Sequence, residues 1–114
     1  MRTLDQVQLS ARDRRAIEAA VPALRDQFPV DRIVLFGSKA RGDDTPESDL
    51  DLLVLVHGPV DSQLKRRIRR ALYEISHALG VWFGTLVVES RAWQEGVYRV
   101  LPIRQEIERD GVRT

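Results

Sequence analysis

The stretch FGSKARGDDTPESDLDLLVLV, residues 36–56, decides the fold of this 114-residue chain. It ends in a nearly continuous apolar run, residues 50–56, which is typical of a strand buried on both faces. Another short run of strand formers, residues 32–36, stops at Gly37 and Ser38. Between the two runs, residues 42–48 are rich in turn formers and predict a loop. The stretch therefore predicts two strands with a tight turn and a polar loop between them.

Helical patterns flank these strands on both sides. Ile17, Val21 and Leu24 recur at helical spacing before them, and a longer apolar stripe of the same kind follows them. Because strands and helices alternate, we expect an α/β fold with a short mixed sheet flanked by helices. The predicted helices are residues 10–28, 61–79 and 102–110, with one turn at 90–93, and the third predicted strand is residues 81–88.

The composition is that of one globular domain, which we expect over residues 1–114. The formal net charge is only +1, so the molecule as a whole is not an obvious binder of polyanions. The chain has no cysteine, which excludes disulfides and thiolate metal ligands. No apolar run is long enough to cross a bilayer, and the start MRTLDQVQLSARDRR has no apolar signal segment. We therefore expect a cytoplasmic protein.

Gly37 and Ser38 stand directly after the first strand. Glycine lets the backbone turn sharply and approach a ligand closely. If residues 38–41 start a short helix, its first N–H groups and the Ser38 hydroxyl can bind an anion. Lys39 and Arg41 either add positive charge to this site or are ordinary solvated loop residues. A Gly-Ser pair alone is more typical of a plain turn, so its meaning depends on what lies beside it.

Asp49 and Asp51 lie at the start of the second strand. Residues two apart on a strand project from the same face, with backbones about 7 Å apart. Magnesium prefers carboxylate oxygens, and a carboxylate in a buried strand is costly unless it is paired or metal-bound. Taken alone, Asp49 could cap a turn and Asp51 could lie on an edge strand. Together with the anion donors, however, the pair supplies what phosphoryl-type transfer needs.

The pattern G-S-x10-D-x-D resembles the signature of the DNA polymerase beta nucleotidyltransferase superfamily, and the chain looks most like the minimal nucleotidyltransferases of bacteria and archaea. The resemblance implies that Gly37, Ser38 and Arg41 hold the triphosphate of ATP or another NTP. It also implies that Asp49 and Asp51 ligate two magnesium ions and carry out catalysis. The expected reaction moves a nucleoside monophosphate, foremost AMP, to a hydroxyl group and releases pyrophosphate.

Active proteins of this kind usually have a third carboxylate, on a later strand, that helps to activate the acceptor hydroxyl. The matching strand here, residues 81–88, contains no acid. Thr85 falls near the expected place, but a hydroxyl is a poorer base and magnesium ligand than a carboxylate. Glu89 becomes the third acid if the strand is offset. The sequence therefore supports nucleotide binding more strongly than catalysis, and leaves open whether the protein is an enzyme.

The resemblance also implies a partner. Minimal nucleotidyltransferases often resemble the antitoxin of a toxin–antitoxin pair, in which the toxin is a small helical protein of the HEPN type. Two functions follow: the chain adenylylates such a toxin, or it is a catalytically weak antitoxin that neutralises its partner by binding alone.

A third function, RNA binding, rests on the basic run of residues 65–70. The apolar stripe through that run favours an ordinary solvated helix face instead. Trp82 and Phe83 are expected in the core or on a partner surface. His57 and His77 have no matching ligand at a useful spacing and are expected to be structural.

Overall fold

Strands β2 (Val30–Phe36) and β3 (Leu50–Val56) form the centre of the sheet in this computed structural model, which describes residues 1–114. They run antiparallel, and β4 (Phe83–Glu89) pairs with β3 in parallel. Two short strands, β1 (Arg2–Thr3) and β5 (Val112–Arg113), complete the sheet in the order β1-β5-β2-β3-β4. The predicted mixed sheet is confirmed. The sequence did not indicate β1 and β5, because two residues are too few to show a period.

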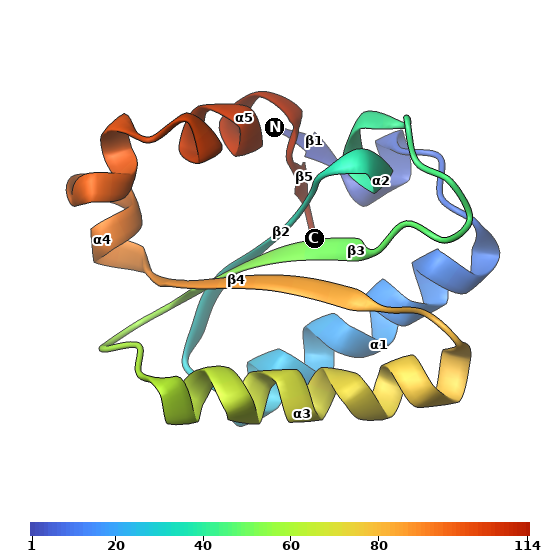
Figure 1. Cartoon of the computed structure of the whole chain (residues 1–114), viewed down its shortest axis with the longest axis horizontal. Coiled ribbons are helices and arrows are strands. Elements are labelled where there is room, and N and C mark those ends of the chain that lie inside the picture. Colours follow the sequence, from blue (N-terminus) through green and yellow to red (C-terminus); the bar gives the residue numbers. More distant parts are fainter.

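Five helices and two single 3-10 turns surround the sheet: α1 (Ala11–Gln27), α2 (Ser38–Arg41), α3 (Ser62–Leu79), α4 (Ser90–Glu95), α5 (Pro102–Asp110), η1 (Leu4–Gln6) and η2 (Val97–Val100). Helices α1 and α3 lie side by side against one face of the sheet, while α4, η2 and α5 cover the other (Figure 1). The larger apolar core lies under α1 and α3, and a smaller one lies under α4 and α5. This arrangement confirms the predicted α/β class.

Side-chain caps fix where the two long helices begin. The Ser10 hydroxyl accepts a hydrogen bond from the Asp13 N–H at 3.0 Å, and the Asp61 carboxylate accepts one from the Leu64 N–H at 2.8 Å. Helix α3 ends at Gly80, whose φ of +71° is a left-handed conformation that glycine adopts readily. Both long helices are confirmed to within one residue at each end.

Residues 65–70 lie on α3, and Ile68 is the only buried residue among them, as the apolar stripe predicts. Trp82, expected in the core or against a partner, is 64% exposed just before β4. No helix here combines the length and apolar character that a membrane span requires.

Candidate functional site

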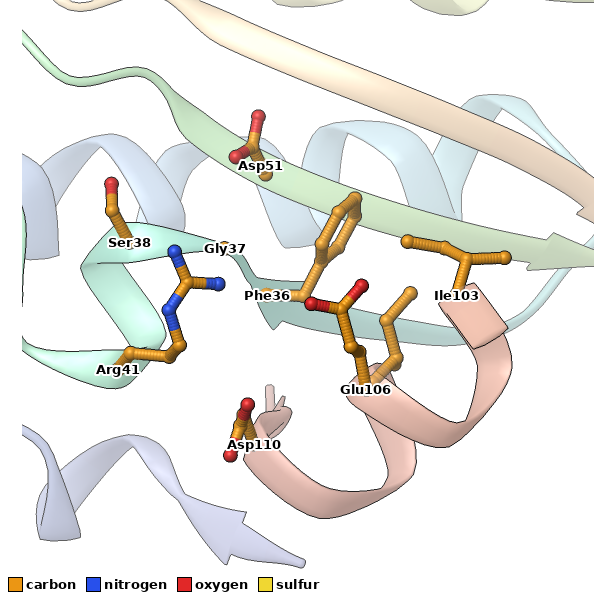
Figure 2. Close-up of a pocket in the computed structure, with 9 residues that line it drawn as sticks. Phe36, Gly37, Ser38, Arg41, Asp51, Ile103, Glu106 and Asp110 are labelled. Carbon is orange, nitrogen blue, oxygen red and sulfur yellow. The ribbon is translucent and has the colours of Figure 1, made fainter. Parts of the chain in front are cut away.

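Segments from β2, α2, β3 and α5 surround a cavity of about 300 Å³ at one end of the central strands (Figure 2). The antiparallel pairing of β2 and β3 brings the end of one strand beside the start of the other, so that Phe36 faces Asp51. Helix α5 closes the opposite wall. The lining residues are Phe36, Gly37, Ser38, Arg41, Asp51, Ile103, Glu106, Ile107 and Asp110.

Asp51 has its carboxylate between two glycines. A methyl group built on Gly37 would overlap its Oδ2 atom, and one built on Gly84 would overlap its Oδ1 atom. Gly84 is in direct register with Asp51 across the parallel pair of β3 and β4. Gly37 also has a φ of +77°, a conformation that other residues rarely adopt. The two glycines therefore create the space that the Asp51 side chain occupies.

The surroundings of Asp51 disfavour its ionised form. Burial raises the pKa of Asp51, the charge of Asp49 raises it further, and the positive charge of Arg41 lowers it in part. Asp49 is exposed immediately before β3 and does not line the cavity, but its charge acts on Asp51. The two aspartates predicted to work together are thus electrostatically coupled.

This pair fits a divalent cation. Oxygen ligands suit magnesium, and a cation would relieve the repulsion and desolvation that raise the pKa of Asp51. No group of three or more His, Cys, Asp or Glu side chains lies close enough together to hold a metal ion. Magnesium usually keeps several waters and takes its other ligands from substrate phosphates. Asp49 and Asp51 are therefore the residues that would hold it, together with a bound nucleotide.

The predicted anion site is a single helical turn. Gly37 is the N-cap of the four-residue helix α2, and the first N–H groups of any helix lack partners within it. Arg41 donates from Nε to Oδ2 of Asp43 at 3.1 Å. Its guanidinium group points toward Gly37 and Ser38 (Figure 2). The Asp43 hydrogen bond, followed by the charges of Asp110 and Glu106, keeps the pKa of Arg41 above its ordinary value.

Lys39 is not a solvated loop residue, and it does not line the cavity. Its side chain is 4% exposed, and Nζ lies 2.8 Å from Oδ2 of Asp13 and 3.1 Å from Oδ2 of Asp44. Burial alone would lower the pKa of Lys39, but the hydrogen bonds from Asp13 and Asp44 raise it overall. Lys39 thus joins α2 to helix α1 and to the loop before β3, and its side chain is shielded from bulk solvent.

As the sequence indicates, β4 has no acid beside Asp51, but its register places neither Thr85 nor Glu89 at the site. Thr85 is in register with Leu52 and lines a groove beside Leu72 and Tyr73 of α3, on the opposite face from Asp51. Glu89 pairs with Val56 at the far end of β4. The residue directly beside Asp51 is Gly84. A register difference of one residue places a side chain on the other face of a sheet, and the register of a parallel pair cannot be read from one strand's sequence.

Helix α5 contributes cavity residues that sequence reasoning missed. Ile103, Glu106, Ile107 and Asp110 follow the helical spacing i, i+3, i+4 and i+7, and therefore share one face. The sequence shows the helical period of this face, but nothing in the sequence shows which part of the sheet the face covers. Both nitrogens Nε and Nη2 of Arg109 donate to the carboxylate of Asp110, at 3.1 and 3.0 Å. Arg109 in this way lowers the pKa of Asp110.

Known proteins are similar to this chain in sequence. Residues 17–110 match the family model described as a nucleotidyltransferase domain. Two proteins of Methanocaldococcus jannaschii, MJ0604 and MJ1379, named as candidate protein adenylyltransferases, are 45% identical over 51 residues and 41% identical over 54. These matches cover 43% and 47% of this chain, and the chain spans about half the length of these relatives, 49% and 48%.

Solved structures share the fold. A candidate minimal nucleotidyltransferase superposes with a TM-score of 0.58 at 28% identity, over 92% of this chain and 96% of the other. A toxin–antitoxin structure with AMP-PNP superposes with a TM-score of 0.60 at 20% identity, over 84% of this chain and 69% of the other. At that lower identity the likeness concerns the fold alone.

Proposed function

This chain belongs to the nucleotidyltransferase domain family, and from that premise we propose that it binds a magnesium–NTP complex and transfers the nucleoside monophosphate to a hydroxyl group. The observation that carries the proposal is the position of Asp51, whose carboxylate lies between Gly37 and Gly84 at the rim of a cavity. In this proposal Asp49 and Asp51 ligate the metal, and Gly37, Ser38 and Arg41 bind the triphosphate. Bound magnesium would neutralise charge on the phosphates and on the leaving pyrophosphate.

We propose ATP as the donor and a protein hydroxyl as the acceptor. The similar proteins of Methanocaldococcus jannaschii are named as protein adenylyltransferases, and one toxin–antitoxin structure of the same fold contains AMP-PNP. We further propose that the acceptor lies on a toxin, that this toxin is a small helical protein of the HEPN type, and that residues 1–114 act as one nucleotidyltransferase domain. Transfer of AMP to a toxin side chain would then neutralise the toxin.

The first experiment is calorimetric titration of ATP into the protein, with and without magnesium. We expect wild type to bind ATP only with magnesium, and Asp49→Asn/Asp51→Asn to bind it in neither condition. Glu47→Gln/Glu108→Gln is a matched control, because it removes the same two charges from exposed positions outside the cavity. Equal binding by the two double variants would contradict the proposed metal site.

A second candidate function is supported by Gly84. Because no acid stands beside Asp51 on β4, the protein could neutralise its partner by binding alone. Co-expression with a toxin separates the two functions. An enzymatic antitoxin loses protection in Asp49→Asn/Asp51→Asn, and mass spectrometry detects AMP on the toxin only with wild type. Full protection by the double variant, with an unmodified toxin, would establish the binding function instead.

A further inference from the structure

Strand β4 has no room for a carboxylate beside Asp51. Gly84 holds the position in register with Asp51, and a Cβ atom there would overlap Oδ1 of Asp51. The next residue, Thr85, faces α3. If the protein transfers a nucleotide as proposed above, the group that accepts the proton of the attacking hydroxyl must come from another element that lines the same cavity.

Helix α5 provides the only other carboxylates in that cavity, Glu106 and Asp110. Asp110 is already engaged: Arg109 donates two hydrogen bonds to its side chain, and Arg2 donates one to its backbone oxygen at 2.7 Å. The lowered pKa of Asp110 makes it a weak base. Glu106 takes part in none of the ion pairs of the protein. Of the two α5 carboxylates in the cavity, Glu106 is therefore the one without an ion-pair partner.

The neighbours of Glu106 fix its backbone. Ile107 is 2% exposed and packs into the smaller core with Leu53 and Leu55, which lie on the same face of β3 as Asp51. The Glu106 carboxylate projects into the cavity beside Phe36, with Asp51 on the other side of the space and Arg41 at its edge (Figure 2). A hydroxyl that enters between Asp51 and Glu106 would approach from the side opposite Ser38, where the triphosphate is proposed to bind.

We propose that Glu106 is a catalytic residue that accepts the proton of the acceptor hydroxyl, in place of the acid that β4 lacks. The acceptor oxygen forms a bond to the α-phosphorus of ATP as its proton passes to the Glu106 carboxylate. The bond between the α-phosphorus and the oxygen that bridges to the β-phosphate breaks. Pyrophosphate leaves with that electron pair, and AMP remains on the acceptor.

Glu106→Gln and Glu108→Gln form a matched pair for the test. Both residues are exposed on α5 and both changes remove one negative charge, but Glu108 does not line the cavity. Pyrophosphate release from saturating MgATP is measured first with water as the acceptor and then with pooled peptides bearing Ser, Thr and Tyr. Glu106→Gln should release pyrophosphate at least about 100-fold more slowly, within the range of general base catalysis, and bind MgATP as wild type does. Glu106→Asp should recover part of the rate, and Glu108→Gln should match wild type.

Equal rates in Glu106→Gln and Glu108→Gln would overturn the role of Glu106 and leave the proposed function standing. A wild-type protein that binds MgATP, releases no pyrophosphate with either acceptor and leaves a co-expressed toxin free of AMP would overturn the enzymatic function and the role of Glu106 together.

Discussion

The carboxylate of Asp51 is in contact range of two glycine positions, and Gly84 tests that geometry most cleanly. Gly37 has a positive φ, so Gly37→Ala would also strain the backbone. Gly84 has no positive φ, so Gly84→Ala acts only through the contact of the added methyl group with Asp51. We expect Gly84→Ala to rotate the Asp51 side chain and weaken MgATP binding by about 10- to 100-fold, as changes next to metal ligands usually do. Calorimetry measures this directly.

Gly58→Ala is the control for that change. Gly58 has a φ of +89° with open space around it, so an added methyl group strains the backbone without touching the site. It should lower the free energy of unfolding by about 1 kcal/mol and leave MgATP binding unchanged. If Gly84→Ala binds MgATP as tightly as wild type does, then MgATP binding does not depend on the present position of the Asp51 carboxylate.

The raised pKa of Asp51 predicts how metal-free stability depends on pH. A carboxyl group that holds its proton more tightly in the folded state stabilises the fold fully below its ordinary pKa of 3.8, and this contribution is lost as pH rises through the raised value. At neutral pH the ionised Asp51 therefore destabilises the metal-free fold. Asp51→Asn should raise the free energy of unfolding at pH 7 in EDTA, and the gain should shrink toward pH 4. Urea titrations at both pH values test this, and a gain that grows toward pH 4 would refute it.

Among the elements, α2 depends on a buried ion pair. Lys39 and Asp13 have side chains that are 4% and 6% exposed, and their contact holds α2 against α1. Lys39→Met leaves the Asp13 carboxylate buried and unpaired, so it should lower the free energy of unfolding by about 3–5 kcal/mol. Asp13→Asn leaves Lys39 its pair with Asp44 at 3.1 Å, so it should lower stability by less than Lys39→Met does. Arg91→Ala breaks an exposed pair with Glu95 on α4, and should change stability by less than about 0.5 kcal/mol. Denaturant titration of the three variants makes the comparison, and similar small effects in all three would contradict the prediction.

The same elements show what a sequence can and cannot reveal. The apolar stripes and the Gly37-Ser38 turn are local signals, and these helices and strands were predicted from them. The role of Lys39 was not predictable, because Asp13 lies 26 positions away in sequence and only tertiary packing brings it near. The face of Thr85 was misjudged for a related reason, since register depends on the partner strand. The contribution of α5 to the cavity was missed for another reason. A helical period shows which residues share one face of a helix, but it does not show what that face packs against.

Across the whole molecule, the chain's first strand joins the two walls of the cavity. Arg2 donates from Nη2 to the backbone oxygens of Ala40 in α2 and Asp110 in α5, both at 2.7 Å. Its own strand, β1, is attached to the sheet only through β5, so the start and the end of the chain together hold α2 and α5 at a fixed separation. The phosphate side and the proposed proton acceptor lie on these two walls. The distance between these two walls therefore depends on Arg2, which lines neither of them.

Arg2→Ala should lower the rate of pyrophosphate release while leaving MgATP affinity nearly unchanged. Loss of two hydrogen bonds to a charged group should lower the free energy of unfolding by about 1–2 kcal/mol. MgATP affinity should change little, because Gly37 directly follows β2 and Asp51 lies on β3, and neither strand depends on Arg2 for its pairing. Pyrophosphate release at saturating MgATP should fall by about tenfold or more, since small displacements of reacting groups cost large factors in rate. Arg25→Ala removes an equal charge from an exposed position on α1 and should leave both quantities unchanged. If Arg2→Ala instead loses MgATP affinity and keeps its rate at saturation, Arg2 shapes the nucleotide site itself and does not set the distance between the two walls.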